Sequence, residues 1–237
     1  VKAKSEIFEG ITKGGCAVIN RDFSSYEKTI KLAKKCGINK FISFGINNNA
    51  DVKLISRKQL YKSQSIEAEA YGKKYSYKIN FDGIHQAVNS LSVLAILILL
   101  DCDVEFALSS LSSSVMPKGR GNKFILSKNK NKIFLIDDTY NANPSSVKAS
   151  INLFGEISKK NRKMLILGEM SELGLYSKSL HLDLIDCIVS NKIDIIMFIG
   201  NKTKDIYNNL KDDIKCFWNS DSKSLIASNF IDYILPD

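Results

Sequence analysis

The sequence has few histidines and prolines, and its cysteines form no metal-binding pattern. Its 237 residues include two histidines, three prolines and five cysteines, with no C-x-x-C pair. This cysteine usage excludes a zinc site of the usual spacing and favours reduced thiols. No basic and apolar signal pattern opens the chain, and the apolar run "LSVLAILILL" (91–100) is shorter than the ~18 residues that a membrane span needs. We therefore expect a cytoplasmic protein without membrane insertion.

The sequence also has a deficit of acidic residues, which leaves a formal net charge of +9. General enrichment in lysine on solvated faces is the favoured explanation, ahead of anionic small-molecule ligands. Nucleic acid is the least supported partner, because the lysines are scattered and no basic, aromatic-interleaved module occurs. We expect no nucleic-acid partner.

The first half of the chain has the pattern of an α/β domain. Strands are expected at 15–20 and 40–46 around a helix at 24–37, with antiparallel strands over 54–81 and helices at 82–103 and 104–111. The segment "LSSSVMPKGRGNK" (111–123) is rich in serine, glycine and proline and predicts a domain junction. We place the domains at 1–116 and 124–237, with a linker at 117–123.

The second half alternates strands and helices again. Strands are expected at 132–137, 162–168 and 193–200, and helices at 144–157, 175–191, 202–211 and 223–235. This alternation predicts a doubly wound parallel sheet. Such a sheet leads us to expect another strand after the last helix, and we interpret the chain as a fragment.

The segment "DDTYNANPSS" (137–146) follows an apolar run that is typical of a buried strand. The carboxyl ends of such strands bind ligands in α/β proteins, although Asn-Pro and Ser-Ser also form ordinary turns and helix caps. The phosphate-loop pattern G-x-x-x-x-G-K-[ST] does not occur. The nearest approach to it, "FIGNKTK" (198–204), lacks the earlier glycine and is interpreted as a plain turn.

Five segments together resemble the Mur ligases, ATP-dependent enzymes that form amide bonds in peptidoglycan synthesis. They are "VKAKSEIFEG" (1–10), "GIHQAVNSL" (83–91), "KGRG" (118–121), "DDTYNANPSS" and "LGEMSELG" (167–174). The last two are similar to the branch that joins D-alanyl-D-alanine to UDP-MurNAc-tripeptide. The resemblance implies the rear part of the central ATP-binding domain, followed by a Rossmann-like, doubly wound C-terminal domain truncated at its end.

The resemblance implies a metal-binding role for Lys4, as a carbamate that holds Mg²⁺. A carbamate converts the cationic side chain into an anion with two oxygens, and hard oxygen ligands suit Mg²⁺. Carbamylation requires a neutral amine, which burial or nearby cations would favour. The alternative from the residues alone is an exposed lysine near the end of the chain.

The resemblance also implies an ATP site. Arg120 matches a catalytic arginine that reaches the phosphates, and Asp138 matches the aspartate that accepts from the ribose hydroxyls. Asn89 matches a reader of the adenine edge, whereas Gln86 replaces an asparagine usual in the family. The full set of implied nucleotide-site residues is His85, Asn89, Arg120, Asp138, Tyr140, Asn141 and Asn143.

The segment "LGEMSELG" is expected to face the second substrate. Glu169, Ser171 and Glu172 could contact the ammonium of the incoming dipeptide or cap the next helix, and the residues do not separate these alternatives. His181 is interpreted as a residue of a helix face.

The family reaction would pass through an acyl phosphate on the tripeptide carboxylate. The family's UDP-binding domain, phosphate loop and an acidic Mg²⁺ ligand would precede Val1, so we expect this chain to be inactive alone. We also expect it to be a monomer. Three alternatives remain: a non-catalytic remnant, a partner of a separately encoded N-terminal piece, and a sister ligase with another amino-acid substrate.

Overall fold

The computed structural model describes residues 2–60, 63–128, 131–157, 161–228 and 230–234. Its internal contacts divide the chain into two units, Val1–Met116 and Pro117–Asp237. The N-terminal unit contains two buried hydrophobic clusters among the described residues, and the C-terminal unit contains one.

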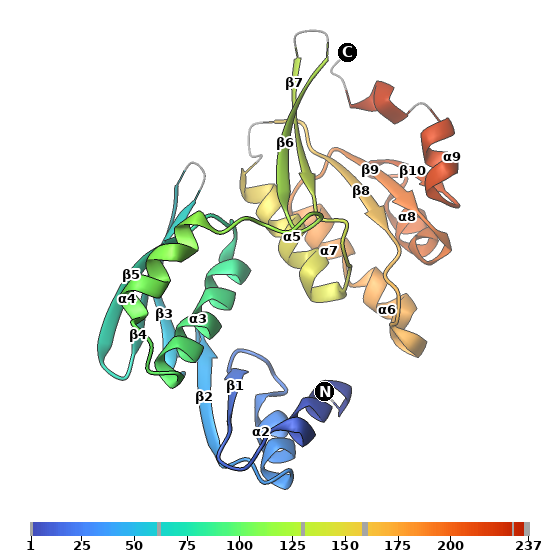
Figure 1. Cartoon of the computed structure of the whole chain (residues 1–237). Helices are drawn as coiled ribbons and strands as arrows, with labels where there is room; N and C mark the ends of the chain where they lie inside the picture. Colours follow the sequence, from blue (N-terminus) through green and yellow to red (C-terminus); the bar gives the residue numbers. More distant parts are fainter. Residues whose placement is uncertain (1, 61–62, 129–130, 158–160, 229, 235–237) are drawn as a thin grey trace. The chain divides into compact units, whose positions relative to one another are not determined.

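A five-stranded sheet in the order β1-β2-β3-β4-β5 forms the N-terminal unit (Figure 1). Its strands are β1 (Cys16–Asn20), β2 (Lys40–Gly45), β3 (Val52–Gln59), β4 (Gln64–Ala70) and β5 (Lys73–Ile79). The first three are parallel, and β3, β4 and β5 are antiparallel neighbours. The antiparallel strands predicted over 54–81 are confirmed, with the turn from β4 to β5 at Tyr71 and Gly72, both at positive φ. Because two reversals restore the direction, β5 ends at the same edge of the sheet as β1 and β2.

The helix α3 (Ile84–Leu99) lies against this sheet and supplies much of its core. The other helical segments of the unit are α1 (Lys2–Ser5), η1 (Glu6–Gly10), α2 (Tyr26–Lys35), α4 (Val104–Ser110) and η2 (Leu111–Ser113). The prediction of one helix over 82–103 was too long at both ends. Gly83 at φ +90 precedes the helix, and Asp101 at φ +51 follows it in the left-handed conformation that ends many helices.

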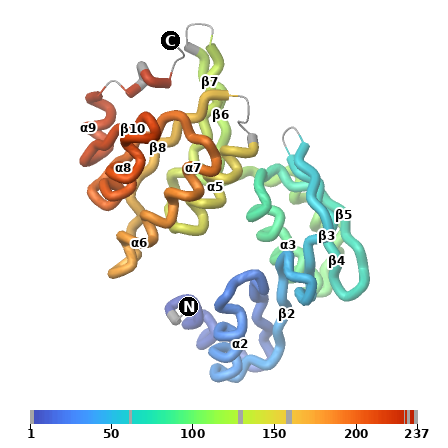
Figure 2. Tube along the Cα trace, turned by 180° about the vertical axis from the view of Figure 1, so that it is seen from behind, coloured from blue at the N-terminus to red at the C-terminus, as the bar shows by residue number. Residues whose placement is uncertain are grey.

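The C-terminal unit contains a parallel sheet in the order β10-β9-β8 and a separate antiparallel hairpin, β6–β7. The strands are β6 (Asn122–Lys128), β7 (Asn131–Asp137), β8 (Met164–Gly168), β9 (Ile195–Ile199) and β10 (Lys215–Asn219). The helical segments are α5 (Pro144–Ile157), η3 (Gly174–Tyr176), α6 (Ser177–Leu182), α7 (Ile185–Ser190), η4 (Asn201–Thr203), α8 (Lys204–Leu210), α9 (Ser222–Ala227) and η5 (Phe230–Tyr233). Helices α5 and α7 lie side by side (Figures 1 and 2).

The structure corrects several sequence-based boundaries in this unit. Strands β6 and β10 were not predicted: β6 begins inside the expected linker, and β10 has only five residues. The helix predicted over 175–191 is split into α6 and α7, because a tight turn forms where Leu184 N donates to His181 O. The last predicted helix, 223–235, divides into α9 and η5, and residues 229 and 235 lie outside the described residues.

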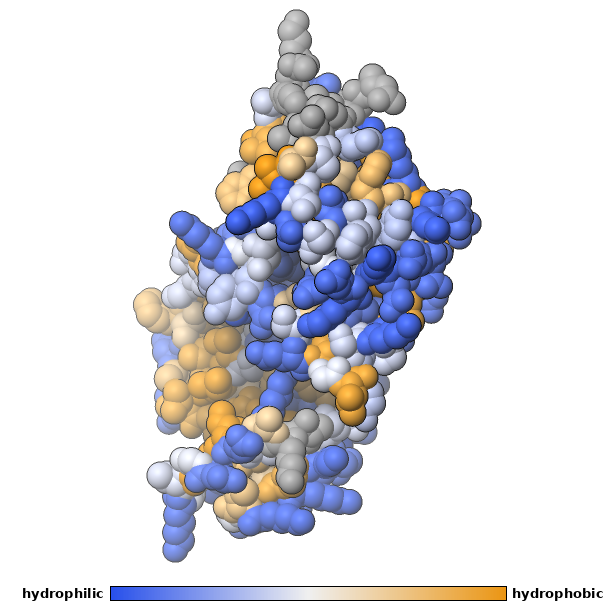
Figure 3. All heavy atoms as spheres, turned by 90° about the vertical axis from the view of Figure 1, so that its right-hand side faces the viewer, coloured by the Kyte–Doolittle hydropathy of each residue, from blue (hydrophilic) through white to orange (hydrophobic). Residues whose placement is uncertain are grey.

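Large apolar side chains occur both in the buried core and on the surface. Figure 3 shows hydrophobic patches between hydrophilic side chains on the face that it draws. Across the described ranges, no helix combines the length and the hydropathy that crossing a membrane demands.

A buried phenol joins β5 to α3 and makes the N-terminal unit sensitive to alkaline pH. Tyr77 is buried on β5, and its hydroxyl lies 2.8 Å from Ser90 Oγ on α3. Because Ser90 Oγ donates to Ala87 O at 2.7 Å, the phenol is the donor of the Tyr77–Ser90 bond. Burial raises the pKa of Tyr77 from 10.0 to about 12.

We predict that the free energy of unfolding of this unit falls as the pH rises from 10 to 12. The unfolded chain loses the Tyr77 proton near pH 10.0, whereas the folded unit retains it to about 12, so the stabilisation is complete below pH 10. Two pKa units correspond to roughly 2 to 3 kcal/mol. Urea unfolding of Tyr77→Phe should lack this component, and Tyr75→Phe on the same strand is the control. An equal pH dependence in wild type and Tyr77→Phe would contradict the prediction.

Candidate functional site

The carboxyl edge of the N-terminal sheet carries His85 and Asn89. Both lie near the start of α3, and their spacing of four residues puts them on one face of the helix. Asn89 is exposed and His85 is half-buried. An exposed side-chain amide at this edge can both donate to and accept from a polar ligand.

A buried glutamine determines where α3 begins. Gln64 on β4 is fully buried, and its Nε2 donates to Phe81 O at 2.6 Å and to Gly83 O at 3.1 Å. Its Oε1 accepts from Arg57 Nη1 at 3.3 Å. These bonds hold the turn that precedes His85. Sequence reasoning missed Gln64, because no motif marks a single glutamine at the start of a strand.

Asp22 closes the loop after β2 at the same edge. Its carboxylate oxygens accept from the backbone N–H groups of Ile46 and Asn47, each at 2.9 Å. The loop leaves Asn47, Asn48 and Asn49 exposed around an open hollow of about 620 Å³. These asparagines were also missed by sequence reasoning, and their only signal is the run "NNN" directly after a strand.

Lys4 lies on the four-residue helix α1 and is exposed. In the part of the chain that the structure describes, no group of three or more histidine, cysteine or carboxylate side chains could hold a metal ion. Lys4 as a carbamate would therefore be an isolated ligand within the described ranges.

In the C-terminal unit, the structure brings "KGRG" and "DDTYNANP" together. Tyr140 N donates to Gly119 O at 3.0 Å, and Gly121 N donates to Asp137 O at 2.8 Å. The Arg120 guanidinium carbon lies 4.4 Å from the centre of the Tyr140 ring. This cation–π contact orients a cation beside the end of β7, where it can meet an anionic ligand.

The two adjacent aspartates at the end of β7 have different environments. Asp137 Oδ1 accepts from Thr139 N at 3.2 Å and from Thr139 Oγ1 at 2.6 Å, which closes a local turn. Asp138 is exposed, and its Oδ2 accepts from Ser150 Oγ on α5. The hydroxyl of α5 therefore orients the Asp138 carboxylate while it remains exposed at the strand end.

The asparagines that follow are engaged locally. Asn143 immediately precedes α5, and its Oδ1 accepts from Ser146 N at 3.0 Å, as a helix N-cap does. Asn141 is exposed, and its Oδ1 accepts from Ala142 N at 2.9 Å. The helix-cap alternative thus describes the local geometry of Asn143. Tyr140, which lies against Arg120, and Asn141 both remain exposed.

Glu169 is bound to a neighbouring turn. Its Oε2 accepts from Lys202 N at 3.1 Å, and its Oε1 lies 3.9 Å from Lys202 Nζ. The turn "FIGNKTK" therefore receives a carboxylate of the protein itself. Ser171 and Glu172 lie further along the same loop and are exposed.

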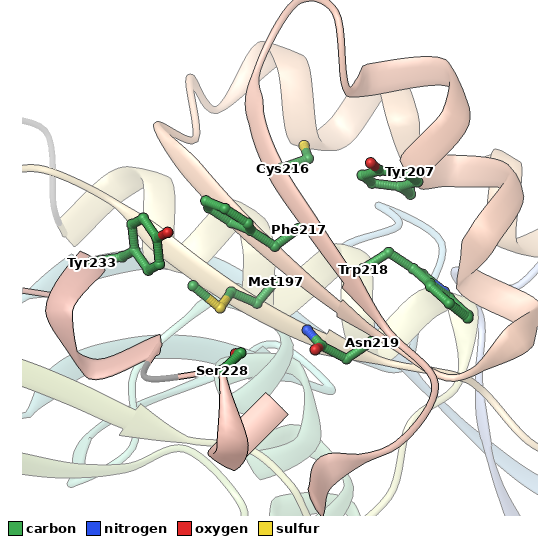
Figure 4. A pocket seen from close by; sticks show the side chains of 8 residues that line it. All are labelled: Met197, Tyr207, Cys216, Phe217, Trp218, Asn219, Ser228 and Tyr233. Carbon is green, nitrogen blue, oxygen red and sulfur yellow. The ribbon is translucent and has the colours of Figure 1, made fainter. Parts of the chain in front are cut away.

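A cavity of about 280 Å³ beside β10 lies apart from these residues. Figure 4 shows side chains of β9, β10, α8 and the segment after α9 around it, including Phe217 and Tyr233, whose ring centres are 4.4 Å apart. Burial raises the pKa of the Cys216 thiol at this cavity to about 11. The thiol is protonated at neutral pH and is a poor nucleophile.

We predict that Gly119→Ala destabilises the C-terminal unit more than Gly121→Ala. Both glycines have a positive φ, +73° and +83°, so either alanine introduces a strain of about 1 kcal/mol. A Cβ at Gly119 would also lie 2.9 Å from Tyr140 N, whereas a Cβ at Gly121 meets no described atom within 4 Å. Urea unfolding should give a loss of about 2 kcal/mol or more for Gly119→Ala. Equal losses for the two variants would contradict the close contact between the two segments.

Two family models match the chain. The Mur ligase middle domain matches residues 1–97, and the Mur ligase, glutamate ligase domain matches residues 124–230. Together they cover the polar residues described above except those of "KGRG" (118–121), which lies between the two matches.

Curated relatives and solved structures agree with these matches. UDP-N-acetylmuramoyl-tripeptide–D-alanyl-D-alanine ligase of Rickettsia prowazekii is 34% identical over 213 residues, which are 90% of this chain and 46% of the relative. A structure of MurF from Acinetobacter baumannii has a TM-score of 0.75 at 21% identity, covering 98% of this chain and 54% of that one. MurF of Thermotoga maritima in complex with ADP has a TM-score of 0.70 at 21% identity, with 95% and 54% covered.

The chain thus spans about half the length of the relatives that it matches. Its mixed α/β architecture agrees with their fold, and the two matched domains follow each other in the same chain. These matches show that the chain belongs to the Mur ligase family.

Proposed function

We propose that this chain forms part of a cytoplasmic, ATP-dependent ligase that joins D-alanyl-D-alanine to UDP-MurNAc-tripeptide. The observation that carries the proposal is the placement of Arg120 on Tyr140 beside the exposed Asp138. A guanidinium suits the phosphates of a nucleotide and a carboxylate suits its ribose hydroxyls, and both groups occur at one strand end. The names of the relatives supply the substrates in this proposal.

Each side chain has a chemical reason for its proposed role. Asp138 accepts from the ribose hydroxyls through the oxygen that Ser150 leaves available. Arg120 donates to phosphoryl oxygens, and its planar guanidinium can bind them in a bidentate manner. Asn89 contacts the adenine edge with His85 beside it, and Tyr140, Asn141 and Asn143 line the nucleotide or peptide side.

The proposed reaction has two steps. An oxygen of the tripeptide carboxylate attacks the γ-phosphorus of ATP, and the bond to ADP breaks to give an acyl phosphate. The amine of D-alanyl-D-alanine then attacks the acyl carbon, phosphate leaves, and the amine loses a proton as the amide forms. Arg120 stabilises the negative charge that develops on the transferred phosphoryl group.

The loop after β8 is proposed to face the amine substrate. Ser171 and Glu172 are exposed there, and Glu172 offers a carboxylate to the ammonium form of the dipeptide. Glu169 belongs to the same loop, although its carboxylate accepts from Lys202 N.

We further propose that the chain is inactive by itself and monomeric. No phosphate-loop pattern occurs in its 237 residues, and Lys4 as a carbamate would need Mg²⁺ ligands other than a cluster among the described residues. A preceding segment, joined to the chain or encoded separately, would supply both. Purified chain that forms ADP from ATP in the presence of both substrates would contradict this proposal.

We predict that Asp138→Asn, but not Asp137→Asn, raises the KM for ATP by about tenfold or more, because a hydrogen bond to a charged acceptor contributes about 1.5 to 3 kcal/mol. The assay measures ADP formation by the chain supplemented with the first half of the Rickettsia prowazekii ligase. Asp137→Asn is the matched control, because Asp137 closes the turn at Thr139. A KM for ATP that Asp138→Asn leaves unchanged would contradict the ribose-binding role.

A further inference from the structure

We propose that His181 and Glu169 are positioning residues that hold the loop after β8, residues 169–176, in the conformation that receives the amine substrate. This inference rests on the proposed function, since it assigns the loop to that substrate. It changes the role of Glu169 from a substrate contact to a structural one, and it gives His181 a specific partner.

The imidazole of His181 has a single tautomer that satisfies its neighbours. The side chain is fully buried on α6, and Nε2 lies 2.9 Å from Met170 N. Nδ1 lies 2.7 Å from Ser177 O. Because a carbonyl oxygen only accepts and a backbone N–H only donates, Nδ1 carries the proton and Nε2 accepts from Met170. The neutral ring thus ties the loop to α6.

Glu169 holds the loop from its other side. Its carboxylate accepts from Lys202 N in the turn after β9, the strand next to β8 in the sheet. Gly200 in that turn has φ +93°, and a Cβ there would lie 2.6 Å from Glu169 Oε2. The absence of a side chain at Gly200 therefore lets the carboxylate approach the backbone of the turn.

Met170, between these two contacts, is itself fully buried in the core of the unit. The start of the loop is consequently fixed by one buried side chain and two hydrogen bonds to other elements. The following residues have the opposite character: Leu175 is 100% exposed and Tyr176 is 72% exposed, close in sequence to the exposed Ser171 and Glu172.

The exposed part of the loop has the chemistry that a small apolar dipeptide needs. A carboxylate attracts the ammonium group, and neighbouring apolar side chains can cover methyl groups. An anchored loop loses less conformational entropy when the ligand binds, so the two anchors favour binding without touching the ligand. This separates the anchoring residues from the contacting residues within one short segment.

The test uses matched substitutions in the chain. His181→Gln keeps an acceptor near the Nε2 position, whereas His181→Phe removes it. Glu169→Ala breaks the second anchor at an exposed residue, and Lys202→Ala keeps the backbone donor as its control. If His181→Phe does not fold, Glu169→Ala still tests whether the loss of an anchor weakens dipeptide binding.

Two signals are followed by NMR: hydrogen exchange of the Met170 amide, and shifts of the 169–176 amides on titration with D-alanyl-D-alanine. We expect His181→Phe to lose protection at Met170, and we expect His181→Phe and Glu169→Ala to weaken the dipeptide's affinity about tenfold. His181→Gln and Lys202→Ala should resemble wild type. L-alanyl-L-alanine is the ligand control.

The outcomes separate the two proposals. If wild type binds the dipeptide and both anchor-breaking variants bind it equally well, the positioning role is wrong and the proposed function stands. If the dipeptide does not perturb the loop of wild type, the assignment of this loop to the amine substrate fails, and the positioning role for that substrate fails with it.

Discussion

The candidate site of the C-terminal unit depends on two backbone hydrogen bonds, from Tyr140 N to Gly119 O and from Gly121 N to Asp137 O. They attach the segment before β6 to the segment after β7, and they place Arg120 over the Tyr140 ring. Without them Arg120 would lie on an untethered junction, and its entropy would oppose any ordered contact with a ligand. Gly119 meets this need because its positive φ and its missing side chain allow the approach to Tyr140.

The sequence predicted the elements that have a clear hydrophobic periodicity or that are bounded by turn-forming residues. The strands over 54–81, the helix that carries His85 and Asn89, and the strand before Asp137 all have strong local signals, and the structure contains them. Strand β6 was missed because glycine and asparagine introduce it and because its hydrogen bonds come from β7. That omission left Arg120 on an expected linker, so its contact with Tyr140 could not be derived from the residues.

The residues whose structural role sequence reasoning could not find share one physical feature. Gln64, His181 and Asp22 bind backbone groups of segments distant from them in sequence, and local periodicity carries no trace of such bonds. Sequence alone could therefore propose residues that face a ligand, through a resemblance, but it could not find those that hold the loops. The "LGEMSELG" segment illustrates the limit, because Glu169 and Glu172 look equivalent in the sequence and differ only in their three-dimensional partners.

The same distinction, between residues that hold loops and residues that are proposed to face a ligand, applies to the carboxylates at the strand ends. Asp22, Asp137 and Glu169 each accept from at least one backbone N–H group, whose position the fold fixes, so these carboxylates cannot turn toward a ligand without losing a formed bond. Asp138 accepts from a side-chain hydroxyl, which can rotate to suit a new partner. Binding a ligand therefore costs least at Asp138. A cluster of acidic residues at a strand end thus contains both structural and available members, and the donors that they already accept from tell them apart.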